Sequence, residues 1–230
     1  MKILERLPRE SGREFALRTI KDNIIHLELA PGSPISENEL AAAMGLSRTP
    51  VREALSELSR AKVVEICPQK KSVVSLIDYD LVEEASFLRN LLECAVVELD
   101  CRMAGEDDIA GLRESVRLQD FYLRERRSEK LWELDNLFHQ SLFEIARKPQ
   151  AFALLQGISI HFDRVRNMAL HTGKDLKDLN TVQDHQDITE AIACRDAAAA
   201  RQLMETHLNR YKIDAAVIQE KYPAYFRRQA

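Results

Sequence analysis

Residues 47–55 read SRTPVREAL, a stretch that combines two arginines, a proline and a regular apolar spacing. The apolar residues that recur at helical intervals from this point are Val51, Leu55 and Leu58. They predict a helix over 47–61 with one face on a core, and Ser47 fits its N-cap, where the hydroxyl accepts a hydrogen bond from the first turn. Arg48 and Arg52 share the opposite, solvent-facing side. The stretch therefore predicts an anchored helix with two cations near its start.

The residues before this helix predict two further helices and a tight turn. A helix is expected over 14–27, ended by the turn-forming sequence APG at 30–32. The sequence SENE at 36–39 is a capping box that predicts a short helix over 36–44, and Gly45 suits its left-handed end. Two helices joined by a short turn containing glycine are typical of a helix-turn-helix motif.

Two β-branched runs follow the third predicted helix. VVEI at 63–66 and SVVSLI at 72–77 predict the strands of a small hairpin. The connecting sequence CPQKK places Lys70 and Lys71 at its tip, which is therefore basic. Three helices and such a hairpin predict a winged helix-turn-helix domain over residues 1–77.

The rest of the chain has helical patterns and no convincing strand. After a short hinge at 78–80, the expected helices span residues 81–104, 106–126, 129–146, 150–171, 176–194 and 197–220. We therefore expect a mainly α fold, in which the winged domain is followed by an all-α antiparallel helix bundle over 81–222 and a C-terminal tail over 223–230.

The composition fits a mainly helical protein outside the membrane. The 230 residues include only 7 glycines and 7 prolines, which disfavours a loop-rich all-β fold. No apolar run of about 18 residues predicts a transmembrane helix. The N-terminus lacks the apolar run of a signal peptide, and 4 cysteines without CxxC spacing are typical of reduced thiols. We therefore expect a cytoplasmic location.

Charge is distributed unevenly along the chain. The net charge is −4, which by itself argues against nucleic acid as a partner. Residues 1–77, however, hold 12 basic and 10 acidic residues, whereas the rest of the chain holds 21 basic and 27 acidic residues. The N-terminal part can therefore bind phosphate while the acidic remainder has another role.

The third predicted helix fits a recognition helix, whose N-terminal residues contact base edges in the major groove. Arginines there reach guanine or phosphate, hydroxyls bind phosphate or a base, and lysines at the hairpin tip suit a neighbouring groove. The predicted DNA-binding residues are Ser47, Arg48, Thr49, Arg52, Lys70 and Lys71. The alternative is an ordinary solvated helix face, but the turn, the caps and the hairpin together favour DNA.

The sequence PGSPISENELAAAMGLSRTPVREALSELSRAKVVEICPQKKSVV, residues 31–74, resembles the winged-helix domain of GntR-type transcription regulators. SRTPVREAL is similar to the most characteristic stretch of that family. The resemblance covers the first 77 residues and implies a regulator that binds double-stranded DNA. One departure lies at the wing tip, where the family often has Arg-Gly and this sequence has Lys70 and Lys71.

Four potential metal ligands lie on apolar faces of the predicted helices. They are Asp135, His139, His185 and His207. The first two are four residues apart and share one helix face, and the others stand on apolar stripes of two more helices. A carboxylate near a core needs a partner, and a divalent metal would serve all four residues at once. A single histidine on an apolar face is more often an ordinary core residue, so spacing alone leaves the metal site open.

The helical part resembles the FCD effector domain of the FadR subfamily of GntR regulators. ELDNLFHQSLFEIA is similar to its D-x-x-x-H segment, and QDHQDITEAI and METHLNR are similar to its two later histidine segments. The resemblance implies that Asp135, His139, His185 and His207 bind a divalent metal. We expect zinc, with nickel and manganese as alternatives.

The same resemblance implies a site for a small carboxylic-acid effector. FLRNLLECAVVEL matches the segment whose arginine, here Arg89, meets the effector's carboxylate. DRVRNMAL resembles a segment that lines the pocket and contributes Arg164 and Arg166. An arginine near an open metal position would fix a carboxylate by paired hydrogen bonds. This chemistry recognises a small organic acid without transforming it.

The favoured interpretation is a ligand-responsive transcription regulator, a homodimer on a pseudo-palindromic operator, and not an enzyme. The alternative is a metal-dependent enzyme fused to a DNA-binding module, which would need a general base beside a metal-bound water. Glu144 and Asp184 lie near the ligands in the sequence, but neither is assigned that role. A third interpretation is a constitutive DNA-binding protein whose helical domain only dimerises, with no metal and no effector.

Overall fold

The chain forms two compact units, described by a computed structural model for residues 1–67, 71–171, 180–210 and 217–228. The first unit comprises Met1–Val82, Gly157–Met168 and Val217–Ala230. The second unit comprises Glu83–Gln156 and Ala169–Ala216. The fold is mainly helical, as the sequence predicts. Among the described residues, no helix has the length and apolar character needed to span a membrane.

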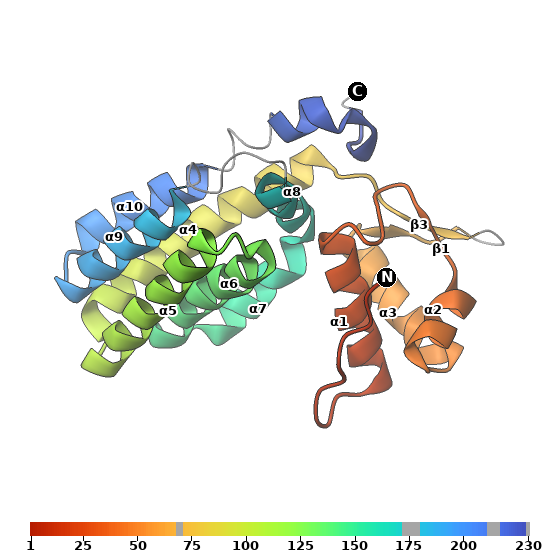
Figure 1. Cartoon of the computed structure of the whole chain (residues 1–230), viewed down its shortest axis with the longest axis horizontal. Coiled ribbons are helices and arrows are strands. Elements are labelled where there is room, and N and C mark those ends of the chain that lie inside the picture. The colour runs from red at the N-terminus through yellow and green to blue at the C-terminus, as the bar shows by residue number, and fades with distance from the viewer. Residues whose placement is uncertain (68–70, 172–179, 211–216, 229–230) are drawn as a thin grey trace. The chain divides into compact units, whose positions relative to one another are not determined.

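Three helices of the first unit form the predicted helix-turn-helix arrangement (Figure 1). They are α1 (Gly12–Ile25), α2 (Glu37–Met44) and α3 (Arg48–Arg60). α1 begins earlier than predicted because Ser11 and Glu14 form a capping box. Gly45 ends α2 with a φ of 64°, a left-handed conformation that glycine adopts without steric penalty. The predicted turn between α2 and α3 is confirmed.

The inner face of α3 is anchored as predicted, whereas its N-cap differs. Val51, Leu55 and Leu58 are buried, and α3 packs against α1 and α2. Ser47 occupies the N-cap position, but its hydroxyl makes no capping hydrogen bond. The predicted side-chain cap is therefore wrong. The first amides of α3 do without the acceptor that an N-cap serine usually supplies.

A small antiparallel sheet forms the wing of the first unit. Its strands are β1 (Pro34–Ile35), β2 (Val64–Glu65) and β3 (Ser72–Val74), in the order β1-β3-β2. Pairing of Val64 with Val74 confirms the predicted hairpin. Strand β1, in which Ile35 pairs with Ser72, was not predicted, because two residues that include a proline carry no readable strand pattern.

A helix from far along the sequence, α8 (Ile160–His171), contributes residues to the first unit. The Nδ1 atom of His161 accepts a hydrogen bond from the amide of Asp78, and its Nε2 lies 3.1 Å from the carbonyl oxygen of Lys62. Burial, and then the charge of Arg164, lower the pKa of His161 to about 4. This neutral histidine therefore joins the segment between α3 and β2 to the residue that precedes α4.

The C-terminal residues also pack in the first unit. The 3-10 turn η2 (Pro223–Tyr225) precedes Phe226, which is buried and forms a parallel bridge with Ile77. The amide of Ile77 donates to the carbonyl oxygen of Tyr225 at 2.8 Å, and the amide of Arg227 donates to that of Ile77 at 2.9 Å. The sequence predicted only a tail over 223–230. This pairing depends on residues about 150 positions apart, which local patterns do not reveal.

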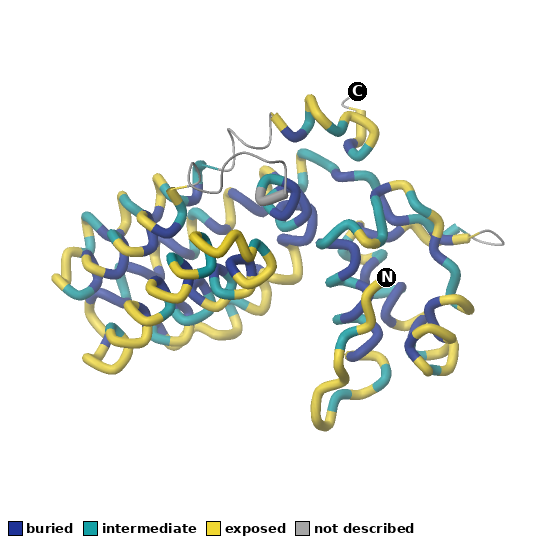
Figure 2. The backbone as a smooth tube through the Cα atoms, viewed as in Figure 1, coloured by how far each residue is buried: buried dark blue, intermediate teal, exposed yellow. Residues whose placement is uncertain are grey.

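The second unit is a bundle of long helices around a hydrophobic core. Its helices are α4 (Tyr79–Met103), α5 (Glu106–Arg124), α6 (Ser128–Ile145), α7 (Pro149–Ile158), α9 (Thr181–Ala193) and α10 (Ala197–Asn209). α5 packs against α6 and α9, and α9 packs against α10. Buried residues line the inner faces of these helices in Figure 2. Fully buried side chains include Phe138, Leu142, Phe143, Ile188 and Ile192.

Two predicted boundaries are wrong because helices begin or stop at other residues. The predicted hinge at 78–80 overlaps α4, which already begins at Tyr79. The helix predicted over 150–171 is interrupted at Ser159, whose carbonyl oxygen accepts the Asp163 amide at 2.7 Å in the first turn of α8. Gly157, a weak helix former, precedes the break.

The last two predicted helices are also shorter than expected where they can be followed. α9 begins after Asn180, which has a φ of 45° outside the helical region. The predicted start at 176 lies outside the described residues. The helix predicted over 197–220 ends at Asn209 as α10, and helical residues are described again only at 217–221.

Candidate functional site

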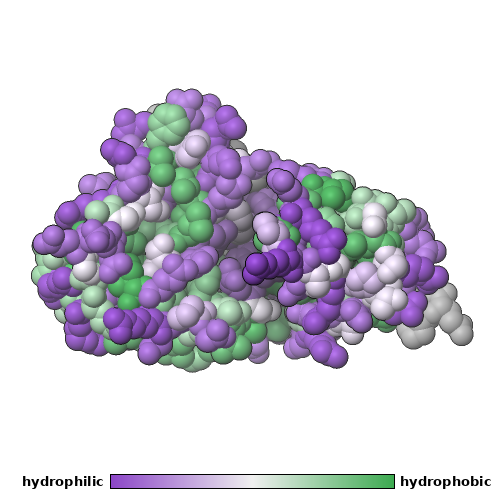
Figure 3. Space-filling model, turned by 90° about the horizontal axis from the view of Figure 1, so that it is seen from below, coloured by the Kyte–Doolittle hydropathy of each residue, from purple (hydrophilic) through white to green (hydrophobic). Residues whose placement is uncertain are grey.

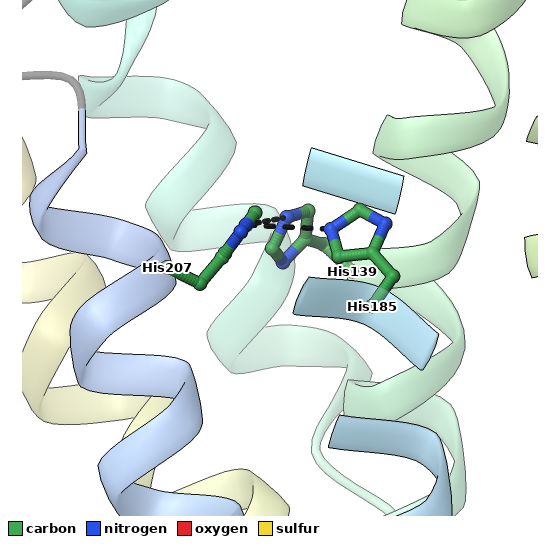
Figure 4. A group of neighbouring side chains, drawn as sticks. All are labelled: His139, His185 and His207. Carbon is green, nitrogen blue, oxygen red and sulfur yellow. Dashed lines mark hydrogen bonds between the residues drawn. The ribbon is translucent and has the colours of Figure 1, made fainter. Parts of the chain in front are cut away.

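Three histidines from three helices of the second unit point toward one another (Figure 4). α6 contributes His139, α9 contributes His185 and α10 contributes His207, each from the side of its helix that faces the core. The Nε2 atom of His207 lies 3.3 Å from Nε2 of His185 and 3.3 Å from Nε2 of His139. One ring nitrogen from each residue lies within 4.8 Å of the others. The structure therefore brings together three of the four predicted metal ligands.

The second ring nitrogen of two of these histidines faces an acceptor. Nδ1 of His139 contacts the carboxylate of Glu93. Nδ1 of His185 lies 2.7 Å from Oε1 of Gln119, and the amide nitrogen of Gln119 donates to the Ser115 hydroxyl at 3.3 Å. These contacts orient both rings and suit a tautomer that carries the imidazole proton on Nδ1.

The third histidine is held by an acidic residue that also binds an arginine. Nδ1 of His207 lies 3.3 Å from Oδ2 of Asp184, and Arg210 donates to Oδ1 of Asp184 at 2.8 Å. Burial favours the neutral acid, but the hydrogen bonds from His207 and Arg210 outweigh it and lower the pKa of Asp184. Burial also lowers the pKa of His207, against the opposing effect of Asp184. Both shifts favour a neutral imidazole beside a charged carboxylate.

In the tautomer that these contacts suit, with each proton on Nδ1, the three Nε2 lone pairs are directed at one another. Two such lone pairs at 3.3 Å repel unless a cation lies between them. A separation of about 3.3 Å also corresponds to two nitrogen ligands of a tetrahedral zinc at about 2.0 Å from the metal. The donor type, the protonation and the spacing of His139, His185 and His207 therefore fit a divalent metal.

The fourth predicted ligand lies beside the histidines without joining their closest group. Asp135 stands one turn before His139 on α6 and is buried. Its Oδ1 lies 3.8 Å from Nε2 of His185. This distance is longer than the two 3.3 Å distances from Nε2 of His207 to the other histidines. Asp135 is thus near the site in the structure, and its role as a ligand stays a prediction.

A buried arginine is linked to this site through a single carboxylate. The Nε atom of Arg89 donates to Oε1 of Glu93 at 2.7 Å, while Oε2 of the same residue faces His139. Glu93 is only 1% exposed. Burial opposes its charge, but the charge of Arg89 and the contact with His139 outweigh burial and hold the pKa of Glu93 well below its usual range. Arg89 is therefore two contacts away from a candidate metal ligand.

The other two arginines predicted to bind an effector belong to the first unit. Nη2 of Arg164 donates to the carbonyl oxygen of Ser75 at 2.6 Å, and burial lowers the pKa of Arg164 to about 9. Arg166 lies 3.8 Å from Asp163. The contact of Arg164 with Ser75 and that of Arg166 with Asp163 both lie within the first unit.

The residues predicted to bind DNA lie at the start of α3 and in the wing. Those that are exposed in the described part are Ser47, Arg48, Thr49, Arg52 and Lys71. Both arginines contact Glu37 of α2, and Lys71 lies 3.2 Å from Glu39. Lys70 lies outside the described residues. Cationic side chains thus project from the helix-turn-helix and the wing, each beside an acidic residue of α2.

Four residues that hold the histidines and Arg89 in place were not assigned from the sequence. They are Glu93, Gln119, Asp184 and Arg210. A signal existed for Glu93, because Arg89 and Glu93 form a charged i,i+4 pair in an otherwise apolar stretch of helix. Gln119 and Arg210 carry no comparable signal, since their partners come from other helices.

Comparison with known families divides the chain into two matched regions. Residues 13–74 match the family described as bacterial regulatory proteins, gntR family. Residues 84–210 match the FCD domain. The first region contains the helix-turn-helix and the wing, and the second contains all three histidines.

Curated relatives match along nearly the whole chain. A transcriptional regulator of the HTH type, located in an unstable DNA locus of Streptomyces ambofaciens, is 34% identical over 95% of this chain and 90% of its own length. The HTH-type transcriptional repressor RspR of Escherichia coli is 30% identical over 95% of both chains. Both proteins are named as regulators of transcription.

Solved structures share the fold at lower sequence identity. McbR/YncC of E. coli has a TM-score of 0.79 and 18% identity, and covers 92% of this chain and 99% of its own. A GntR regulator of Rhodococcus has a TM-score of 0.71 and 22% identity, and the match covers 90% of this chain and 97% of the Rhodococcus chain. These likenesses support the mainly helical fold with an N-terminal helix-turn-helix.

Proposed function

Because the chain belongs to the gntR family of bacterial regulatory proteins, with a C-terminal FCD domain, we propose that a divalent metal and a small carboxylic acid control how it binds DNA. The family makes it a DNA-binding transcription regulator and not an enzyme. The observation that carries the finer proposal is the convergence of the three Nε2 atoms of His139, His185 and His207.

The DNA-reading part of the proposal rests on the start of α3. Arg48 and Arg52 are exposed there and would contact guanine or phosphate, and Ser47 and Thr49 would contact phosphate or a base. The uncapped first turn of α3 supports this assignment, because its amides and partial positive charge attract phosphate. Lysines of the wing, represented by Lys71 in the described part, would contact the neighbouring backbone.

The metal would be held by the three histidines, with Asp135 as the fourth ligand. Neutral imidazoles and a carboxylate suit zinc, and nickel and manganese are alternatives for the same donor set. Glu93, Gln119 and Asp184 would keep the rings in the required tautomer, as outer partners do in metal sites.

The effector would be a small organic acid recognised near Arg89. A divalent cation with an open position supplies a binding point for a carboxylate oxygen. Arg89 supports this class of ligand because it is buried, charged and joined to His139 through Glu93. Its guanidinium can bind a carboxylate by paired hydrogen bonds. Arg164 and Arg166 stay candidates from the sequence alone.

Helix α4 offers a route from the effector to the DNA-reading part. The first residues of α4 belong to the first unit, and Arg89 lies about two turns further along the same helix. An acid that pulls on Arg89 would act on this helix. Coupling of about 1–3 kcal/mol, the usual range, would change operator affinity by roughly 5–150-fold.

A homodimer on a pseudo-palindromic operator completes the proposal. Helix-turn-helix proteins commonly bind two half-sites through two-fold symmetry. Large hydrophobic side chains are exposed on the helices of the second unit, and Figure 3 shows hydrophobic residues gathered between hydrophilic ones on one face. Such patches often mark protein contacts. With its two domains, the chain would fall in the FadR subfamily and act in the cytoplasm, where bacterial DNA lies.

The proposal is tested by operator titration with a panel of small organic acids. An operator is first selected from random duplexes with the wild-type protein, and its affinity is measured with and without each acid. At least one acid should change affinity in metal-loaded protein and lose its effect in chelator-treated protein. Arg89→Gln should keep the metal and lose the response, whereas Arg201→Gln, which removes an exposed pair with Glu98, should behave as wild type.

An operator affinity that no acid changes in metal-loaded protein would contradict the effector proposal. An acid response that persists in the chelator-treated protein or in Arg89→Gln would contradict the roles of the metal and of Arg89. Family membership and DNA binding would stand in either case.

A further inference from the structure

One carboxylate oxygen at the start of α2 is shared by the two arginines of α3. Oε2 of Glu37 lies 3.5 Å from Nη2 of Arg48 and 3.2 Å from Nη2 of Arg52. It also lies 3.3 Å from Nε of Arg52. The side chains of Arg48 and Arg52 are 60% and 64% exposed, whereas that of Glu37 is 26% exposed. An acidic residue therefore lies directly between the two cations predicted to read DNA.

These ion pairs have little value for the stability of the fold. Pairs between exposed side chains contribute little, because water and salt screen them and ordering long side chains opposes them. Their geometric effect is larger. Two guanidinium groups four residues apart repel, and a shared carboxylate offsets the repulsion and restricts their rotamers. Glu37 thus favours rotamers in which the two guanidinium groups lie beside each other before any DNA is bound.

We propose that Glu37 is a positioning residue that sets the sequence specificity of this regulator. The inference rests on the proposed DNA-reading role of Arg48 and Arg52. Bound to Glu37, the two guanidinium groups lose less freedom when they meet the correct base edges. The negative charge of Glu37 also repels phosphates of any sequence, which disfavours non-operator DNA. Both effects raise the ratio of operator affinity to non-operator affinity.

The two effects can be separated with two substitutions at the same position. Glu37→Gln removes the charge and keeps the size of the side chain. Glu37→Asp keeps the charge and withdraws it from the arginines by the length of one carbon–carbon bond. Glu53 provides a matched control, because it is exposed on α3 and pairs with no residue in the described part of the chain. Glu53→Gln therefore removes the same charge from the helix without releasing the arginines.

The experiment measures the affinity of each full-length variant for two duplexes at fixed salt. One duplex carries the operator selected with the wild-type protein, and the other has the same composition in scrambled order. Glu37→Gln should bind the scrambled duplex roughly fivefold more tightly, the effect of removing one like charge near a phosphate. The ratio of its affinity for the operator to its affinity for the scrambled duplex should fall by roughly fivefold or more. Bidentate contacts with guanine discriminate between the correct and the wrong base by at least that factor.

Glu37→Asp and Glu53→Gln separate the effect on the arginines from the effect of charge alone. Glu37→Asp should lower the operator-to-scrambled ratio while leaving the affinity for the scrambled duplex unchanged. Glu53→Gln should raise both affinities equally and preserve the ratio. A preserved ratio in Glu37→Gln and Glu37→Asp would overturn the inference. If selection with the wild type enriches no sequence at all, the proposed DNA-reading role of the arginines fails, which is a separate and distinguishable outcome.

Discussion

Glu93 and His139 are in direct contact inside the second unit, and the other oxygen of Glu93 binds Arg89 at 2.7 Å. A candidate metal ligand and a candidate effector-binding residue therefore share one carboxylate. Because that carboxylate is buried, its two partners cannot be exchanged for water. Whatever moves Arg89 also acts on the group that orients His139.

Glu93→Gln should impair both halves of this arrangement. The amide cannot accept hydrogen bonds at both ends, and the ion pair with buried Arg89 is lost. We expect metal affinity to fall by about 10–100-fold, the usual cost of losing an outer partner. The free energy of unfolding should fall by about 3–5 kcal/mol, as when one partner of a buried ion pair is removed. A metal titration against a competing chelator and urea denaturation measure the two effects.

Glu98→Gln serves as the control for this prediction. Glu98 lies on the same helix and pairs with Arg201 at 2.8 Å, but both side chains are at least one-third exposed. Its loss should cost less than about 1 kcal/mol and leave metal affinity unchanged. Equal effects of the two substitutions would show that Glu93 has no special connection to the histidines.

Arg52→Ala and Lys71→Ala should weaken DNA binding in different ways. Arg52 is proposed to contact base edges, so its loss should cost about 1–3 kcal/mol at the operator and relax sequence preference. Lys71 is proposed to contact phosphate, so its loss should weaken binding to all sequences and reduce the salt slope by about one. Titration of the operator and of a scrambled duplex at several salt concentrations distinguishes them. An unchanged operator affinity in Arg52→Ala, with the fold intact, would contradict the recognition-helix assignment.

Asp100 should make the stability of the protein depend on pH. It is fully buried on α4, and neither carboxylate oxygen has a hydrogen-bond partner among the described residues. Burial, with a smaller effect of Asp108, raises the pKa of Asp100 to about 8. Because the folded state holds this proton more tightly than the unfolded chain, stability should fall as pH rises from about 4 to about 8.

Asp100→Asn, which stays neutral, should remove this loss. Relative to wild type, the free energy of unfolding of the variant should rise by roughly 1.4 kcal/mol per pH unit between about pH 4 and about pH 8. Above about pH 8 the difference should stay constant. Urea denaturation from pH 5 to pH 9 provides the comparison. The exposed Asp107→Asn removes a carboxylate from the same turn of α5 without touching Asp100; it is the control and should follow the wild-type profile. A constant difference between Asp100→Asn and wild type across this range would show that Asp100 is already ionised in the folded protein.

Phe226→Ala should release the C-terminal segment from the first unit. Phe226 is 4% exposed and belongs to the bridge with Ile77, so truncation leaves a cavity beside that pairing. We expect faster proteolysis after residue 216 and faster amide exchange at Ile77, whose N–H donates to Tyr225. Phe121→Ala, at a side chain that is 54% exposed, should change neither. Wild-type exchange at Ile77 in Phe226→Ala would mean that the pairing does not depend on this side chain.

The helix-turn-helix could be predicted because its signals are local. The apolar spacing of Val51, Leu55 and Leu58 predicts the buried face of α3, and Gly45 predicts the end of α2. The pairing of Phe226 with Ile77 could not be predicted, because it joins segments that no sequence pattern connects. The contribution of α8 to the first unit escaped prediction for the same reason.

The candidate metal site could likewise be predicted only in part from the sequence. Asp135 and His139 could be placed on one face by their spacing, whereas the convergence of His185 and His207 was expected only from resemblance to a family. The contact between His207 and Asp184 depends on how α9 packs against α10. Periodicity predicts which face of a helix is buried, but it does not predict which buried polar groups meet.

The central claim, that the three histidines bind a divalent metal, is tested most directly by calorimetric titration of chelator-treated protein with zinc. Wild type should bind one equivalent per chain. His207→Ala should lose zinc affinity by more than about 10–100-fold, the loss expected from removing a residue that only orients a ligand. The control is His26→Ala, which alters the histidine at the C-cap of α1 and should bind zinc as wild type does. If wild type binds neither zinc, nickel nor manganese, or if His207→Ala binds zinc as tightly as wild type, the proposed metal site is contradicted.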